Sequence, residues 1–246
     1  MYNEMVVMGV ILARAGSRGL PDKCIRDLMG RAVIEYTFDH AAASRTLTAV
    51  LLTTDSEPAK VLARRAGIEV VDRPSELAGE TATVDAAARH AVAGWEAGHQ
   101  TRVDIVVLLY GNVPIRADGL IDLAVERLID TGADSVRSVA PVSKQHPDWV
   151  HRLDGDRMSQ FRPNSIYRRQ DLEPLFYHDG AVVALTRDAL FAATATPQDH
   201  QAFLGQDRRA LIQSCEDTVD IDEPIDLYLA EALMRARSEP AHAGSC

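Results

Sequence analysis

Cysteine is scarce in this sequence. Three cysteines occur in 246 residues, at positions 24, 215 and 246, with no CxxC spacing and no histidine paired with them. This scarcity argues against a disulfide framework and against a Cys/His zinc site. We therefore expect three reduced thiols.

Positive charge and long apolar runs are also lacking. The chain has 26 Lys and Arg against 36 Asp and Glu, which gives a formal net charge of -10. A nucleic-acid binder needs a basic face, so the composition argues against that class. The apolar run 5–13 is too short to cross a membrane, and no basic flank precedes it. We expect a soluble cytoplasmic protein without a nucleic-acid or membrane partner.

Short apolar runs alternate with segments of helical periodicity along the chain, a pattern typical of βαβ units. It predicts an α/β protein with a mainly parallel sheet and helices on both faces. The expected strands are 6–12, 49–53, 67–71, 104–109, 135–142 and 180–185, and the expected helices are 32–43, 57–66, 84–96, 117–131, 186–192 and 224–235. Residues 144–173 are polar and contain prolines, which predicts an insertion within a single domain 1–246.

A basic turn follows the first predicted strand. It carries Arg14, Ser17, Arg18 and Lys23. The turn matches neither a Walker A motif nor a dinucleotide fingerprint. Gly16 and Gly19 let backbone N–H groups approach an anion, and the three cations could neutralise a polyphosphate. A solvated basic turn has the same composition, so the turn alone favours phosphate binding only modestly.

An acidic segment near the C-terminus contains a second pattern. If residues 219–222 are extended, Asp220 and Asp222 point to one face while Val219 and Ile221 point inward. Neighbouring carboxylates repel unless a cation joins them, and oxygen ligands suit Mg²⁺. An acidic cap on the helix that begins at Pro224 is the alternative, but it leaves Asp220 unexplained.

The basic turn and the two aspartates together indicate more than either does alone. Mg²⁺ held by Asp220 and Asp222 would bridge phosphate oxygens. Arg14 and Lys23 would then offset the charge that develops at the α-phosphate and on leaving pyrophosphate. The combination predicts a nucleotidyl-transfer site with Arg14 and Lys23 as its catalytic residues.

These segments resemble the cytidylyltransferases that activate acidic sugars, namely the acylneuraminate (CMP-sialic acid) synthetases and their Kdo relatives. The matching stretches are 11–23, 51–56, 72–83, 106–116, 168–183 and 217–222, in the order that the family has them. The resemblance implies a Rossmann-like α/β domain and Mg²⁺-dependent transfer of CMP from CTP with release of pyrophosphate. It also implies a homodimer in which a small inserted dimerisation segment reaches the neighbour's site.

The resemblance also carries residue roles. It places Arg14, Ser17 and Lys23 at the triphosphate, with Arg18 where the family usually has a lysine. It places Arg73, Ala82 and Thr83 on the nucleoside side of the pocket. Arg169 matches a substrate-facing arginine, and Asp220 and Asp222 match the metal-binding aspartates.

Departures from the family pattern cluster on the acceptor side. Tyr110 stands where sialic-acid synthetases usually have glutamine, Asp179 replaces an asparagine, and Tyr177 occupies a position that is often basic or polar. With Arg169 these residues are the expected acceptor-binding set. The leading acceptor is a 2-keto-3-deoxy sugar acid of the sialic acid or Kdo type. A different acid such as a phosphonate, and a catalytically inactive nucleotide-binding homologue, remain as alternatives.

Overall fold

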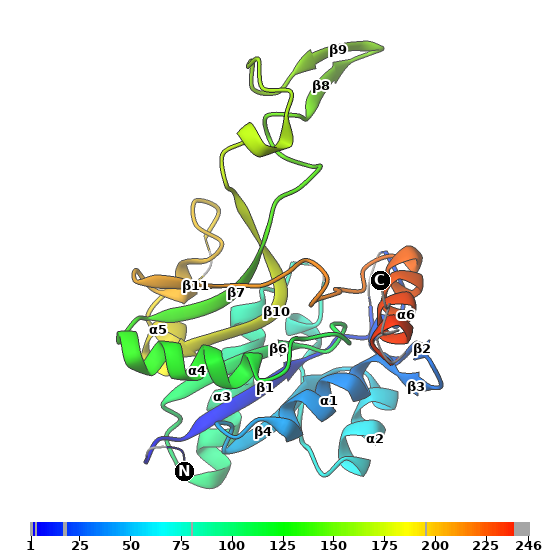
Figure 1. Cartoon of the computed structure of the whole chain (residues 1–246). Coiled ribbons are helices and arrows are strands. Elements are labelled where there is room, and N and C mark those ends of the chain that lie inside the picture. The colour runs from blue at the N-terminus through cyan, green and yellow to red at the C-terminus, as the bar shows by residue number, and fades with distance from the viewer. Residues whose placement is uncertain (1, 3, 17–18, 80, 195, 239–246) are drawn as a thin grey trace, which may run out of the picture.

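A seven-stranded sheet forms the centre of the molecule. The computed structural model describes residues 2, 4–16, 19–79, 81–194 and 196–238. Within them the strand order is β11-β7-β10-β6-β1-β4-β5. The strands are β1 (Val7–Leu12), β4 (Ala49–Thr54), β5 (Glu69–Asp72), β6 (Ile105–Tyr110), β7 (Ser135–Pro141), β10 (Phe176–Thr186) and β11 (Arg208–Ile212). Figure 1 shows this sheet in the body of the molecule.

Strand direction gives the sheet a mainly parallel character. β4, β1 and β6 run parallel, as do β5 with β4 and β11 with β7. β10 runs antiparallel to both β6 and β7. The predicted α/β class with a mainly parallel sheet is therefore confirmed.

Helices cover both faces of this sheet. On one face, α1 (Val33–Ala43), α2 (Glu57–Arg65) and α4 (Leu120–Thr131) contribute buried residues to one apolar cluster. On the other face, α3 (Val84–His99) and α5 (Arg187–Ala192) contribute to a second cluster. Because both faces are buried, β1 and β6 consist almost entirely of apolar residues. α6 (Pro224–Ser238) packs through Ala230 in a third cluster beside Ile221.

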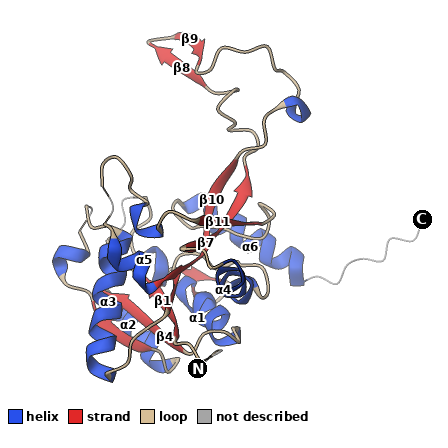
Figure 2. Ribbon diagram, turned by 90° about the vertical axis from the view of Figure 1, so that its left-hand side faces the viewer, coloured by secondary structure: helices blue, strands red, loops and turns tan. Residues whose placement is uncertain are grey.

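A projecting arm separates β7 from β10. It holds the hairpin β8 (His151–Asp154) and β9 (Arg157–Gln160) and the single turn η3 (Arg169–Asp171). Figures 1 and 2 show the hairpin standing far from the sheet in two perpendicular views. Gly155 adopts φ 61 in the two-residue hairpin loop, a backbone conformation that glycine adopts without strain. The hairpin was not predicted from the sequence, although its Asp-Gly pair is a turn signal.

Several predicted boundaries need correction. The last long strand, expected over 180–185, begins at Phe176, and β11 lies in a stretch that was expected to be an irregular polar connection. Each residue of β11 is exposed or only partly buried, because this strand is at the sheet edge. Without a buried face, β11 lacks the apolar alternation by which strands are found in a sequence.

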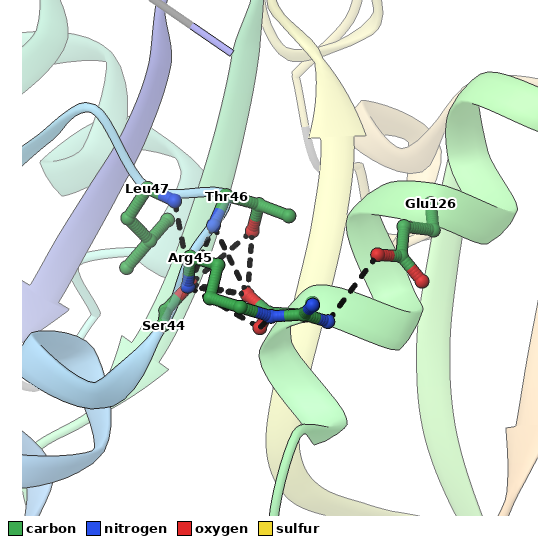
Figure 3. A network of polar contacts seen from close by, with 6 residues as sticks. Ser44, Arg45, Thr46, Leu47 and Glu126 are labelled. Carbon is green, nitrogen blue, oxygen red and sulfur yellow. Dashed lines mark hydrogen bonds and ion pairs between the residues drawn. The ribbon is translucent and has the colours of Figure 1, made fainter.

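One buried carboxylate holds α4 against the loop between α1 and β4 (Figure 3). Asp122 accepts hydrogen bonds from Ser44 Oγ at 2.6 Å, from the backbone N of Arg45 at 3.0 Å and from that of Thr46 at 3.1 Å. Burial alone would raise the pKa of Asp122, but these donors outweigh it and lower the pKa to about 2. Asp122 therefore stays ionised and fixes the orientation of α4.

Candidate active site

A cavity of about 240 Å³ opens at the carboxyl ends of β1 and β6. In open α/β sheets ligands bind at this edge, because loops rather than strands continue from it. The sequence-predicted residues that line the cavity are Arg14, Lys23, Arg73, Ala82, Thr83 and Tyr110. The fold thus brings together segments that are far apart in the chain.

The basic turn leaves β1 along one side of the cavity. Asp55 Oδ1 accepts a hydrogen bond from the backbone N of Ala15 at 2.8 Å, which ties the turn to the end of β4. Arg14 Nη1 donates to the Gly79 carbonyl at 3.4 Å across the cavity. Ser17 and Arg18, the other predicted members of the turn, lie outside the described residues. Asp55 therefore positions the turn, while Ser56 is the N-cap of α2.

The wall of the cavity that we predicted to face the nucleoside is held by contacts within the protein. Arg73 Nη2 donates to the Thr53 carbonyl at 2.9 Å, and burial lowers the pKa of this guanidinium. Thr83 Oγ1 accepts from the backbone N of Ala86 at 3.4 Å and so caps α3. Arg73 and Thr83 are therefore positioned by backbone contacts before any ligand arrives.

Cys24 also lines this cavity. Burial raises the pKa of its thiol to about 11, so Cys24 is a neutral wall residue at physiological pH.

The two predicted metal aspartates each contact a residue that lines the cavity. Val219 and Ile221 are buried, whereas Asp220 and Asp222 are exposed, so the alternation inferred for this segment is confirmed. Asp222 forms an ion pair with Lys23. The structure therefore joins the acidic segment to the basic turn directly.

Asn112 holds Asp220 in place, a role that the sequence did not reveal. Asn112 Nδ2 donates to Asp220 Oδ1 and, at 3.0 Å, to the Ile221 carbonyl. The backbone N of Ile221 donates in turn to the Asn112 carbonyl at 2.9 Å. An asparagine two residues beyond a buried strand was the available signal, because ligands of α/β proteins gather there.

Desolvation and a neighbouring carboxylate govern the electrostatics of Asp220. Although more than a third of the residue is exposed, the protein around its carboxylate desolvates it and raises its pKa to about 6; the carboxylate of Asp222 adds to the rise, while Lys23 and Arg116 oppose it. A cation between the two aspartates would remove this repulsion. Among the described residues, no group of three or more His, Cys, Asp or Glu side chains could hold a metal ion. In the described part of the chain, Asp220 and Asp222 therefore form a pair that belongs to no larger cluster of such side chains.

The predicted acceptor residues occupy different places. Tyr110 lines the cavity, and burial raises the pKa of its phenol. Asp179 is buried, and it accepts from Gln213 Nε2 at 2.6 Å and from the backbone N of Ala181 at 3.0 Å. Tyr177 is exposed on β10, and Arg169 lies exposed in η3 on the arm. Of the four predicted acceptor residues, only Tyr110 lines the cavity.

Comparison with known families decides what kind of protein carries this site. A family model described as cytidylyltransferase matches residues 8–236. This chain belongs to the cytidylyltransferase family. The family resemblance that we drew from the basic turn and the two aspartates is thereby confirmed.

Several relatives of this cytidylyltransferase have names that refer to acidic sugars. The chain is 31% identical over 240 residues to the CMP-N,N'-diacetyllegionaminic acid synthase of Legionella pneumophila, covering 96% of this chain and 99% of the relative. It is 33% identical over 177 residues to the N-acylneuraminate cytidylyltransferase of Streptococcus agalactiae, which is 70% of this chain but only 41% of that protein. It is 31% identical over 208 residues to the 3-deoxy-manno-octulosonate cytidylyltransferase of Chlorobaculum parvum, covering 78% of this chain and 79% of that one.

Solved structures agree on the fold. A CMP:2-keto-3-deoxy-manno-octonic acid synthetase complexed with CTP matches with a TM-score of 0.69 at 20% identity, over 94% of this chain and 99% of that one. A 4-diphosphocytidyl-2C-methyl-D-erythritol synthase from Anaerococcus prevotii matches with a TM-score of 0.64 at 15% identity, over the same shares of the two chains. The Rossmann-like α/β fold of this cytidylyltransferase is therefore established. None of its described helices combines the length and apolar character that a membrane crossing needs.

Proposed function

We propose that the protein transfers CMP from CTP to a small acidic acceptor and releases pyrophosphate. The observation that carries this proposal is the meeting of Lys23 and Asp222 at a cavity lined by Arg14, Arg73 and Thr83. Cations for a polyphosphate and carboxylates for a metal ion are adjacent there. The acceptor that we favour is a 2-keto-3-deoxy sugar acid, because the named relatives include synthases for legionaminic acid, acylneuraminate and Kdo.

The proposed reaction is an in-line displacement. An acceptor hydroxyl oxygen forms a bond to the α-phosphorus of CTP, and the bond between that phosphorus and the bridging oxygen to the β-phosphate breaks. Pyrophosphate leaves, and the hydroxyl proton passes to solvent. Arg14 and Lys23 line the cavity, and in this proposal they bind the triphosphate and offset the charge that grows on the leaving group.

Asp220 and Asp222 fit a magnesium ion. Their carboxylates are hard oxygen ligands, and burial together with the charge of Asp222 raises the pKa of Asp220, a rise that a bound cation would oppose. When bound, Mg²⁺ would neutralise phosphate oxygens of the nucleotide. Asn112, through its hydrogen bond to Asp220, would keep that carboxylate aimed at the ion.

Pyrophosphate release tests the proposal. The protein is incubated with CTP and Mg²⁺ and with N-acetylneuraminate, Kdo or a phosphonate as acceptor, and matched reactions contain EDTA, ATP or UTP. We expect release that requires CTP, Mg²⁺ and a sugar acid. Release with the phosphonate alone would support the alternative acceptor. CTP binding without release for any acid would instead identify an inactive homologue.

We also propose that two copies associate through the arm, and that the protein works in the cytoplasm, where CTP is available. The arm exposes large apolar side chains that a second copy could cover: Leu153 is 72% exposed, Met158 67% and Tyr167 83%. Arg169 on the same arm could then reach the neighbour's cavity. Light scattering should give the mass of a dimer for the parent and of a monomer when these three side chains become serine.

Mixing two inactive variants tests whether the arm acts between copies. Arg169→Ala and Asp220→Asn are each expected to lose most activity. If Arg169 completes the partner's site, mixed dimers contain one intact site, so the mixture should recover about a quarter of the parent's activity. A mixture that stays inactive although mixed dimers form would mean that Arg169 acts within its own chain or not at all.

A further inference from the structure

Arg137 is a partly buried cation near the proposed active site. It has no role in the reaction proposed above. Its Nε is buried and has no hydrogen-bond partner among the described residues. Burial also lowers the pKa of its guanidinium. A buried guanidinium nitrogen without a partner costs stability, so a protein keeps one where a ligand or another group completes it.

The sheet register places Arg137 on the same face as the cavity. Arg137 on β7 pairs with Val183 on β10, and Val183 pairs with Leu108 on β6. Residues paired across strands point to one face of a sheet, and so do residues two apart on one strand. Tyr110 follows Leu108 by two residues, so the side chains of Arg137 and Tyr110 lie on one face. Arg137 is also the positive group that opposes the burial-driven rise in the pKa of Tyr110.

The nearest side chains to Arg137 on its face of the sheet, across β11 and β10, carry no negative charge. On one side Ala210 of β11 is its register partner and offers only a methyl group. Toward the carboxyl end of β7, His178 pairs with Val139 and so lies on the same face of the sheet as Arg137. Burial lowers the pKa of His178, and the charge of Arg137 lowers it further. A neutral histidine can donate one hydrogen bond to an anion.

One carboxylate and one like charge act on Arg137 from nearby, but its Nε donates no hydrogen bond to either of them. Asp179 is the carboxylate that acts on it, yet both oxygens of Asp179 already accept hydrogen bonds, from Ser138 and Ala181 and from Gln213. Arg208 adds like charge, but its own guanidinium is paired with Asp199 at 2.8 Å. An anion bound here would therefore give the Arg137 Nε a hydrogen-bond acceptor that these groups do not provide.

We propose that Arg137 binds the acid group of the acceptor, and so determines specificity for acids in the CMP transfer proposed above, on which this inference rests. The planar guanidinium suits the two oxygens of a carboxylate or of a phosphonate. Tyr110 lies between this cation and the nucleotide cavity, so the acid group would be held on the far side of Tyr110 from CTP. Arg169 on the arm would then contribute to turnover, as proposed above, without holding the acid group.

Calorimetry tests this assignment without turnover. The parent and Arg137→Met are saturated with the α,β-methylene analogue of CTP and titrated with N-acetylneuraminate, its methyl ester, Kdo and phosphonoacetate. Loss of a charged bidentate contact should weaken binding of the acceptor acid about 30-fold, with affinity for the CTP analogue unchanged. The parent should bind N-acetylneuraminate about 30-fold better than its ester, and the variant should bind both equally weakly.

Three further variants separate binding from structure. Arg209→Met removes an arginine that faces the opposite side of the sheet and pairs with Asp207 at 2.6 Å, so it should bind the acids as the parent does. Arg137→Lys keeps the charge but not the planar guanidinium with its paired N–H groups, so its affinity for the acids should fall between those of the parent and Arg137→Met. Arg169→Ala should retain the preference for the acid over the ester. Melting temperatures show whether each variant is folded.

The outcomes distinguish this inference from the proposed function. If Arg137→Met still prefers N-acetylneuraminate to its ester, or if Arg169→Ala abolishes that preference, Arg137 is not the acid-binding residue, whatever the parent's turnover. If the acids bind through Arg137 but no pyrophosphate is released, the inference stands and the proposed transfer fails. If the parent binds none of the acids, both are wrong. Binding of phosphonoacetate alone would support Arg137 and change the acceptor class.

Discussion

Replacing Asp220 by asparagine should stabilise the folded protein at neutral pH while removing the proposed transfer activity. In the ligand-free protein this carboxylate has a pKa of about 6, against an ordinary value of 3.8. Asparagine cannot ionise, and its side-chain oxygen can still accept the hydrogen bond from Asn112. The variant should therefore keep the local geometry and lose the charge repulsion with Asp222.

The size of the effect follows from the shift. At about 1.4 kcal/mol per pKa unit, a rise from 3.8 to about 6 corresponds to ~3 kcal/mol. More than a third of Asp220 is exposed to solvent, which screens the charge, so we expect about 1–2 kcal/mol.

The sign follows from proton binding. Between these two values the folded protein holds a proton that the unfolded chain has lost. The parent's stability relative to Asp220→Asn is therefore highest below about pH 4, and the parent loses it as the pH rises through 6.

Urea unfolding in EDTA at pH 4.5 and pH 7.5 measures this difference. Relative to Asp220→Asn, the parent should lose about 1 kcal/mol or more of its free energy of unfolding between the two pH values. Asp130→Asn, at an exposed position on α4, should follow the parent. Added Mg²⁺ should stabilise the parent at pH 7.5 and not Asp220→Asn. A variant less stable than the parent at pH 7.5, or equally shifted at both pH values, would refute the electrostatic account.

Two further predictions use matched positions. Asp122→Ala removes a buried acceptor of several hydrogen bonds and should cost about 3 kcal/mol of unfolding free energy. Glu126→Ala, whose carboxylate is 3.7 Å from Arg45, should cost under ~1 kcal/mol. Equal costs of the two variants in urea unfolding would contradict the role given to Asp122. A methyl group on Gly19 would clash with the Asp222 carbonyl, while one on Gly16 would meet nothing within 4 Å. Gly19→Ala should therefore cost about 1–3 kcal/mol and lower the melting temperature, with Gly16→Ala near the parent; the reverse order would place the turn elsewhere.

Local patterns in the sequence were enough to predict most of the scaffold. The apolar runs of β1 and β6 and the helical periodicity of α1 and α4 are set by neighbours in the chain, so they can be found without a fold. The same holds for residues 219–222, where alternation placed Val219 inside and Asp220 outside. The basic turn was identifiable because its cations follow a buried strand.

Contacts between distant segments decided the rest. Asn112 and Asp220 are 108 positions apart, and only the packing of the C-terminal segment against the loop after β6 joins them. Asp179 was expected to bind the acceptor, but in the structure its carboxylate already accepts hydrogen bonds from buried neighbours, and no local pattern shows this. Strand β10 runs antiparallel, and only that register sets Arg137 on the face of Tyr110. Sequence alone thus determined which chemistry the site could hold, while tertiary structure decided which side chains face it, because a side chain's partners depend on strand order and register.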